Sequence, residues 1–302
     1  MRQNGWRRFL LRGGRLHPIW RATLYLLGVL AIEVLLAVLL GLVYGLLIVL
    51  LGRSPTELVD SLLAGRLPWS LLLAMGLLRL LIYGSLALVL GRFLDREPAA
   101  TLGILPARLG RDSALGLALG LGAMLLIGGT RLALGWATLE RGAVSAGRFL
   151  LDAAALLPAA AAEEVAFRGY LRRALTSWRG PVVGVAATAV LFALFHGLNP
   201  NLGWLGLLNI ALAGVVFALA VEWSGTLWLA VGYHFAWNLA QGPLLGMPVS
   251  GMAWDGLLAL GADGPALLTG GPFGPEGGLL ATVVLLLSLL PLWAATRRPA
   301  TL

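Results

Sequence analysis

Residues 22–51 are ATLYLLGVLAIEVLLAVLLGLVYGLLIVLL, a run of thirty residues in which Glu33 is the one charged side chain. A transmembrane helix needs about 20 predominantly apolar residues, so this run is long enough to cross a bilayer. It is too long for the apolar core of a cleavable signal, which spans about 7–15 residues. The basic stretch before it, residues 1–21, is expected to lie at the membrane interface.

The composition extends this interpretation to the whole chain. Of 302 residues, 59% are hydrophobic and 12% are charged, and the mean hydropathy is +0.88. Soluble domains have about 25% charged residues, so a polytopic membrane protein is expected. The absence of cysteine excludes disulfides, thiolate nucleophiles and cysteine-ligated metals. All 22 basic residues are arginine, as in GC-rich prokaryotic genomes, and a prokaryotic cell membrane is expected.

Apolar runs of sufficient length predict an all-α bundle of about eight spans. They lie near 22–51, 69–91, 113–136, 150–172, 181–198, 203–221, 226–244 and 279–296. Residues 52–68, GRSPTELVDSLLAGRLP, favour a short surface helix because SPTE resembles a capping box. Residues 246–278 are dense in glycine and proline, which predicts a loop.

The arginines assign the sides of the membrane, because cytoplasmic segments carry an excess of basic residues. With the N-terminus inside, fifteen arginines fall in inner segments and four in outer ones, and both termini are cytoplasmic. The formal charge of +8 then reflects one membrane face, and no nucleic-acid partner is expected.

The expected organisation has five parts. They are a basic cytoplasmic segment (1–21), three N-terminal membrane helices (22–149), a core of four helices (150–245), an outer loop (246–278), and the last helix with its tail (279–302).

Ionisable side chains inside spans are expensive and mark a functional site or a buried pair. The candidates, with two amides, are Glu33, Arg79, Arg131, Glu163, Glu164, Arg168, His196, His234, Asn209 and Asn238. Glu33 and Arg79 lie at matching depths in the first two spans, which predicts a buried pair that supports the bundle.

The stretch AAEEVAFRGYL, residues 161–171, holds three of these groups. Glu164 and Arg168 are four apart and share a helix face, whereas Glu163 points about 100° away and has no partner in sequence. Glu163 and His196 lie 17 and 16 residues from Gly180, where the fourth and fifth spans turn, so both reach about 25 Å from that turn. His234 and Asn238 share a face of the seventh span. One polar cluster in the membrane is therefore feasible.

Such a cluster has the chemistry for peptide-bond hydrolysis. A desolvated carboxylate beside a neutral histidine can accept a proton from water, and Asn and His donors can stabilise an oxyanion. The sequence contains no HExxH motif, no GxSG serine motif and no pair of aspartates within spans.

Three motifs carry a family resemblance: EEVAFR (Glu163, Glu164, Arg168), FALFH (Phe192, His196) and HFAWN (His234, Asn238). They resemble the EExxxR, FxxxH and HxxxN motifs of the CAAX prenyl endopeptidase and bacteriocin-processing (CPBP) family, over residues 150–245. The resemblance implies a glutamate-dependent intramembrane endopeptidase. Glu163 with His196 would activate water, His234 with Asn238 would form the oxyanion site, and Glu164 with Arg168 would order Glu163.

Other interpretations stay open. The same residues would suit a non-proteolytic immunity protein or peptide-binding scaffold, or a transporter with a buried proton relay. No cofactor is expected; if a metal such as zinc binds, its ligands would be Glu163, His196 and His234. The expected partners are membrane lipid and a protein or peptide substrate at the membrane. The substrate and the oligomeric state are not given by the sequence.

Overall fold

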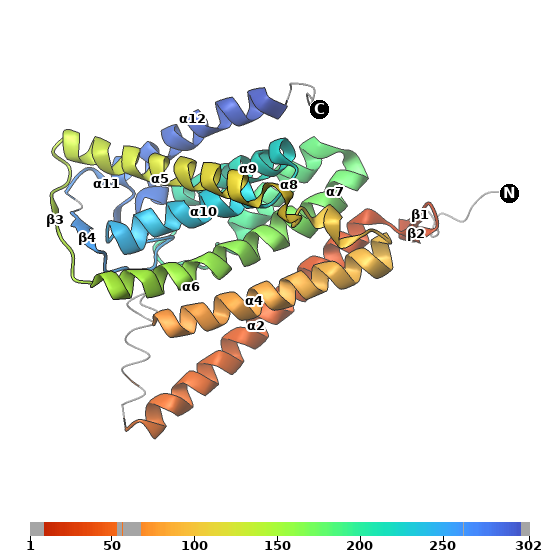
Figure 1. The fold of residues 1–302 in the computed structure, drawn as a ribbon, viewed down its shortest axis with the longest axis horizontal. Helices are drawn as coiled ribbons and strands as arrows, with labels where there is room; N and C mark the ends of the chain where they lie inside the picture. The colour runs from red at the N-terminus through yellow and green to blue at the C-terminus, as the bar shows by residue number, and fades with distance from the viewer. Residues whose placement is uncertain (1–8, 53–55, 57–67, 262, 297–302) are drawn as a thin grey trace.

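The computed structural model describes residues 9–52, 56, 68–261 and 263–296. These residues form a helical bundle, which confirms the predicted fold class (Figure 1). The principal helices are α2 (Pro18–Leu50), α4 (Trp69–Leu90), α5 (Leu109–Ala133), α6 (Ala146–Glu164), α7 (Arg172–Arg179), α8 (Pro181–Phe195), α9 (Trp204–Ser224), α10 (Trp228–Leu239) and α12 (Leu279–Thr296). The predicted surface helix within 52–68 lies almost wholly outside the described residues.

Each of the eight predicted spans coincides with helical structure. Among the described residues, five helices are long and apolar enough to cross a membrane: Pro18–Leu50, Trp69–Asp95, Leu109–Ala133, Trp204–Ser224 and Leu279–Thr296. The helices at the fourth, fifth and seventh predicted spans are shorter or carry more charge. The chain is an integral membrane protein. The number of crossings and the side on which each terminus lies stay predictions.

Two helices continue through π-helical segments. η4 (Val165–Leu171) joins α6 directly to α7, so the fourth predicted span is part of a longer helix that runs from Ala146 to Arg179. η5 (Ala240–Leu244) extends α10 and contains Pro243. π-Helical turns often accompany functional sites, since they change the direction of the side chains that follow. Here they begin directly after Glu164 and two residues after Asn238.

Glycines allow α5 and α10 to pack closely. A Cβ atom on Gly116 or Gly120 would lie 2.3 Å from the carbonyl oxygen of Leu229 or Tyr233, respectively. On α10, a Cβ at Gly232 would lie 2.7 Å from the Ser113 oxygen. Small residues at such spacing let membrane helices approach backbone to backbone. This contact fixes the position of α10, which carries His234.

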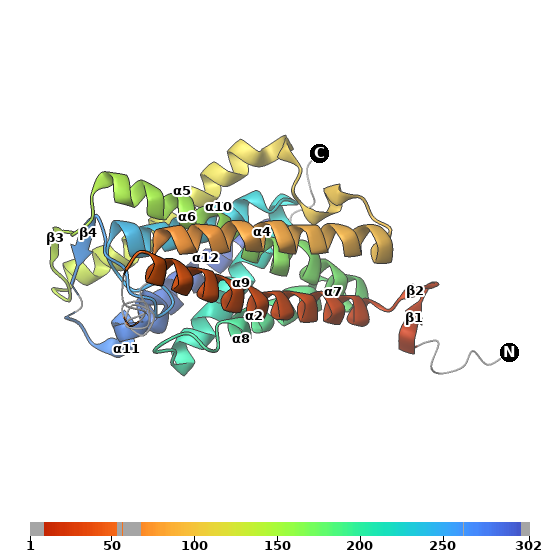
Figure 2. The same ribbon diagram turned by 90° about the horizontal axis from the view of Figure 1, so that it is seen from below.

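The two ends of the bundle are built differently (Figures 1 and 2). At one end, the hairpin of β1 (Leu11–Arg12) and β2 (Arg15–Leu16) precedes α2 and lies near η1 (Gly91–Asp95), where Arg15 donates to the Asp95 carbonyl at 2.6 Å. At the other end, β3 (Leu139–Arg141) pairs antiparallel with β4 (Leu258–Leu260). The start of α2 and the end of α12 both point toward the end that carries α7.

The predicted loop between α10 and α12 is folded against the bundle. It contains β4, α11 (Ala266–Thr269) and the 3₁₀ turns η6 (Gly271–Phe273) and η7 (Pro275–Gly277). Two further 3₁₀ turns, η2 (Ala99–Leu102) and η3 (Pro106–Arg108), connect η1 with α5. Arg131, a predicted in-span arginine, is 2% exposed and donates to the Gly261 carbonyl at 2.8 Å. Its role is therefore to fasten the segment between α10 and α12 to α5.

Candidate active site

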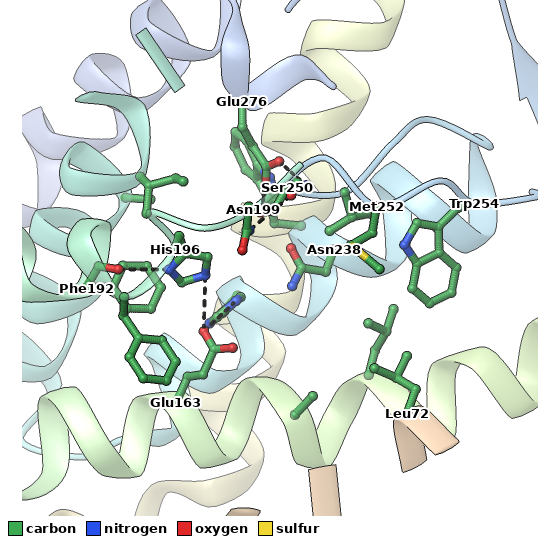
Figure 3. Close-up of a pocket in the computed structure, with 18 of the residues that line it drawn as sticks. Leu72, Glu163, Phe192, His196, Asn199, Asn238, Ser250, Met252, Trp254 and Glu276 are labelled. Atoms are coloured by element: carbon green, nitrogen blue, oxygen red, sulfur yellow. Dashed lines mark hydrogen bonds and ion pairs between the residues drawn. The ribbon is translucent and has the colours of Figure 1, made fainter. Parts of the chain in front are cut away.

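Three elements bring Glu163, His196 and His234 together. Glu163 is the penultimate residue of α6, His196 directly follows α8, and His234 lies within α10. The Oε2 atom of Glu163 is 3.8 Å from His196 Nε2 and 3.9 Å from His234 Nε2. Figure 3 shows the Glu163 carboxylate directed toward the imidazole of His196. The equal depth that the sequence predicted for Glu163 and His196 is thus present in the structure.

His196 caps α8 and is not inside it, which differs from the predicted helix over 181–198. The helix ends at Phe195, and residues 196–203 form a turn, called here the His196 turn. The Nδ1 atom of His196 is 2.8 Å from the Phe192 carbonyl oxygen. Because a carbonyl can only accept, Nδ1 carries the hydrogen, and when the ring is neutral its Nε2 atom presents a lone pair toward Glu163.

Glu164 has different surroundings from its neighbour Glu163. Its side chain is 0% exposed, and its Oε1 atom accepts from Arg168 Nη1 at 3.1 Å. The same oxygen lies 2.9 Å from His234 Nδ1. The predicted Glu164–Arg168 pair is therefore present. The residue that Glu164 directly orients is His234, a contact that sequence spacing did not reveal.

Arg168 is held by a carbonyl and by aromatic rings. Its Nη2 atom donates to the Gly214 carbonyl of α9 at 3.1 Å, and its guanidinium carbon lies 4.2 Å from the Phe192 ring centroid. A guanidinium over an aromatic face gains electrostatic attraction. Phe217 stacks on His234 with ring centroids 4.9 Å apart and an interplanar angle of 12°. The predicted supporting residues Phe192 and Arg168 therefore form one wall behind the two histidines.

A cavity of about 820 Å³ opens in front of this cluster. Its lining combines Glu163, His196, His234 and Asn238 with apolar side chains that include Leu30, Val34, Leu72, Leu156, Ile210 and Leu285. In Figure 3 the Asn238 amide faces the cavity between His196 and Trp254. The predicted site residue Asn238 thus shares the cavity with both histidines.

Glu33 and Arg79 form the pair that the sequence predicted, although it is partly and not fully buried, with side-chain exposures of 18% and 22%. Arg79 Nε donates to Glu33 Oε1 at 2.7 Å, Arg79 Nη2 lies 2.5 Å from Oε2, and the Tyr83 hydroxyl also donates to Glu33. Both members of the pair also line the cavity. They therefore contribute to the cavity wall as well as to the bundle.

Sequence reasoning missed a polar group on the opposite wall. Asn199, Ser250 and Glu276 line the same cavity, and Figure 3 places them above His196. Ser250 and Glu276 belong to the segment that was predicted only as a loop. The amide Asn209, a candidate by its position in a span, holds this segment by donating to the carbonyls of Glu276 at 2.7 Å and Gly278 at 2.9 Å. The one sequence signal was a carboxylate within GPFGPEGG, residues 271–278.

The described residues contain no group of three or more His, Cys, Asp or Glu side chains arranged to hold a metal ion. The two contacts of Glu163 with histidine, 3.8 and 3.9 Å, join ring nitrogens to the same carboxylate oxygen.

Residues 145–240 match a family model described as Type II CAAX prenyl endopeptidase Rce1-like. This match confirms the resemblance to the CPBP family over the part of the chain that holds all seven predicted site residues. No curated protein and no solved structure matches the chain. The family is one of proteases, which supports a CAAX-type protease.

Proposed function

We propose that this protein is an intramembrane endopeptidase in which Glu163 activates a water molecule for attack on a peptide bond. The observation that carries the proposal is the position of Glu163 Oε2, 3.8 and 3.9 Å from the Nε2 atoms of His196 and His234, at the edge of the cavity. The family match over residues 145–240 supports the same chemistry class.

The separation of Glu163 from His196 suits a bridging water. Hydrogen bonds between these atoms would need about 2.7–3.2 Å, so neither histidine bonds Glu163 directly. Glu163 Oε2 and the unprotonated His196 Nε2 are both acceptors, and a molecule that joins them must supply two O–H donors. A water molecule does so and has its own lone pair left for attack.

The reaction then proceeds in two balanced steps. Glu163 takes a proton from the water while the water oxygen bonds to the carbonyl carbon, and the carbonyl oxygen becomes an oxyanion. When the tetrahedral intermediate collapses, the C–N bond breaks and the proton on Glu163 passes to the leaving amine. Asn238 and His234 donate hydrogen bonds to the oxyanion, which act most strongly in a site shielded from water.

The Glu164 contact defines how His234 would donate. Its Nδ1 hydrogen is directed at Glu164 Oε1, so Nε2 donates to an oxyanion when the ring is an imidazolium. With His234 charged, the two glutamates, Arg168 and His234 sum to zero charge. A buried group of ions is tolerated when its charges are paired in this way.

The substrate we propose is a membrane-associated polypeptide, with prenylated peptides as the first class to test. Glu163 lines the cavity together with apolar side chains from α2, α4 and α6. A peptide with a lipid or apolar segment would bury that segment against Leu30, Leu72 and Leu156 while its backbone reaches Glu163. Apolar lining combined with convergent polar groups is typical of ligand pockets.

The scaffold and transporter interpretations use the same residues without cleavage. In a purely structural polar core, ionised groups are expected to have direct partners, as Glu164 has. Among the described residues, Oε2 of both glutamates is buried without a hydrogen bond. Glu164 nevertheless has two direct partners at Oε1 and is 0% exposed, whereas Glu163 is 21% exposed at the cavity and approaches the histidines only to 3.8 and 3.9 Å. This difference between neighbouring glutamates favours hydrolysis.

The test uses purified protein in liposomes with a panel of membrane-anchored peptides, prenylated and unprenylated, and mass spectrometry of the products. We expect one peptide bond to be cut, with one ¹⁸O atom from labelled water in the new carboxylate. Cleavage should continue with a metal chelator present, because activation of water is assigned to Glu163 and His196. Binding of the peptides without cleavage would support the scaffold interpretation and contradict this proposal.

A further inference from the structure

The segment after α10 contributes a carboxylate to the cavity from outside the matched family region. Glu276, in η7, is 9% exposed and lines the cavity together with Glu163 and His196 (Figure 3). It has no part in the reaction described above. Among the described residues, no arginine lies within ion-pair distance of its carboxylate. Its anchoring contacts are all with neutral donors.

Three hydrogen bonds converge on this carboxylate. The Oε2 atom accepts from the backbone N–H of Ser250 at 2.6 Å and from Gln241 Nε2 at 3.1 Å, and Oε1 accepts from the Ser250 hydroxyl at 3.2 Å. Gln241 belongs to η5 and is 0% exposed. The Ser250 N–H and Gln241 Nε2 can only donate, so an amide could replace the carboxylate in one orientation only, with its oxygen at the Oε2 position and its NH₂ group facing the Ser250 hydroxyl. It would also be a weaker, uncharged acceptor.

Ser250 needs such support because of its backbone. Its φ angle is +48°, in the left-handed region that residues other than glycine rarely adopt. Such conformations persist when surrounding contacts hold them in place. Glu276 binds both the backbone N–H and the hydroxyl of Ser250, so it holds this residue at two points.

Ser250 in turn holds the His196 turn. Its carbonyl accepts from Asn199 Nδ2 at 3.0 Å, and the Asn199 backbone N–H donates to the His196 carbonyl at 3.0 Å. The next residue, Gly251, is so close to the turn that a Cβ atom would lie 1.9 Å from the Pro200 oxygen. A continuous set of contacts therefore runs from Glu276 through Ser250 and Asn199 to His196.

We propose that Glu276 is a positioning residue for the reaction, which fixes His196 against Glu163 through Ser250 and Asn199. This inference rests on the proposed function for its catalytic consequence. His196 sits outside the regular part of α8, where helix hydrogen bonds alone do not hold it. The segment between α10 and α12 then positions an active-site residue as well as linking the two helices.

The experiment compares Glu276→Gln with Glu140→Gln, which removes an exposed carboxylate from β3. Peptide cleavage is measured together with a melting curve for each variant. Glu276→Gln should lower kcat at least about 10-fold, because misplacement of a reacting group by about 1 Å can cost 100-fold. Glu140→Gln should match the parent chain. Ser250→Gly in the Glu276→Gln background should restore part of kcat, since glycine adopts positive φ without strain.

A second readout does not depend on cleavage. The chain has no cysteine, so Leu198→Cys, at a fully exposed position in the His196 turn, gives a single site for a nitroxide label. The label should become more mobile with Glu276→Gln, and also with Asn199→Ala, which breaks the chain of contacts from the other side. Should Glu276→Gln fail to fold, the Asn199→Ala protein tests the same contacts.

Increased label mobility together with reduced kcat would support the inference. An unchanged label spectrum, or kcat equal to that of Glu140→Gln, would overturn it. If the parent chain cleaves no peptide, the proposed function fails, and the label spectrum still decides whether Glu276 anchors the turn.

Discussion

The Nδ1 atom of His234 lies 2.9 Å from Glu164 Oε1, the same oxygen that accepts from Arg168 at 3.1 Å. Glu163, one residue earlier, faces the Nε2 atom of the same imidazole at 3.9 Å. The two adjacent glutamates thus lie near opposite nitrogens of one imidazole ring. Glu164 fixes the orientation of the ring from the buried side, and Glu163 faces the ring at the cavity.

Glu164→Gln should therefore lower both stability and cleavage. Arg168 would keep a buried charge without its carboxylate, and removal of one partner of a buried pair typically costs about 3–5 kcal/mol. His234 would also lose the negative charge that supports its charged form, although the amide oxygen could still accept a hydrogen bond. The measurements are the free energy of unfolding in detergent and kcat.

A matched control is Glu222→Gln, which breaks a pair with Arg172 whose glutamate side chain is 27% exposed. It should cost less stability and leave kcat close to that of the parent chain. A Glu164→Gln protein as stable as the Glu222→Gln protein would show that Arg168 does not depend on Glu164.

The Glu33–Arg79 pair should show strong coupling in a double-mutant cycle. Glu33→Gln and Arg79→Gln each leave one partly buried charge unpaired, whereas the double variant leaves none. Its loss of stability should therefore be smaller than the sum of the two single losses. Thermal unfolding of the four proteins measures this coupling. Additive losses would mean that the bidentate contact contributes nothing to the bundle.

Glu276 should make stability depend on pH. Burial raises the pKa of its carboxyl, an effect that the hydrogen bonds from Gln241 and Ser250 oppose. A carboxyl with a raised pKa binds more protons in the folded than in the unfolded state. The contribution of Glu276 to the free energy of unfolding is therefore most favourable below the ordinary pKa of the group, about 4.3. It declines as pH rises through the pKa of the group in the folded state.

The parent chain should consequently lose stability relative to Glu276→Gln as pH rises through that window. Melting temperatures of both proteins are measured across a pH series, and the difference between them isolates the titration of Glu276. If the melting temperature of the parent chain instead rose relative to that of Glu276→Gln with increasing pH, the folded state would stabilise the ionised Glu276 carboxylate, and the prediction would be wrong.

Much of this architecture follows from the sequence because lipid imposes a simple rule. Apolar runs near 20 residues must be helical in a bilayer, since their backbone groups have no other partners there. The eight predicted spans accordingly coincide with helices. The same logic identified Glu163, His196 and His234, since ionisable groups in such runs are rare.

The features that were missed depend on tertiary contacts. The i, i+4 spacing predicts that Glu164 meets Arg168, but its contact with His234 joins residues 70 apart. The helix was predicted to continue to residue 198, past its observed end at Phe195, although Gly197, Asn199 and Pro200 within FALFHGLNP are turn signals that indicate the earlier end. Glu276 was overlooked because glycine and proline predict turns and do not indicate where a loop folds. The packing of Gly251 against Pro200 and of Gly274 against Pro248, together with the hydrogen bonds from Asn209, brings it to the cavity.

The predicted sidedness can be tested with single cysteines in this cysteine-free chain. Ala143 and Arg179 are both exposed and lie at opposite ends of the bundle. In intact cells, an impermeant maleimide should label Ala143→Cys directly and Arg179→Cys only after permeabilisation, because the arginine bias places residue 179 inside. Labelling in the opposite order would reverse the topology.

The cleavage rate of the Glu163→Gln protein tests the central claim most directly. The amide keeps the size of the side chain but cannot accept a proton, so kcat should fall by about 10²–10⁴-fold, while the melting temperature stays near that of the parent chain. His196→Ala should lose activity similarly, and Asn238→Ala should keep more, since one oxyanion donor remains. Near-normal cleavage by a folded Glu163→Gln protein would contradict the account, because the carboxylate would then have no part in activating water.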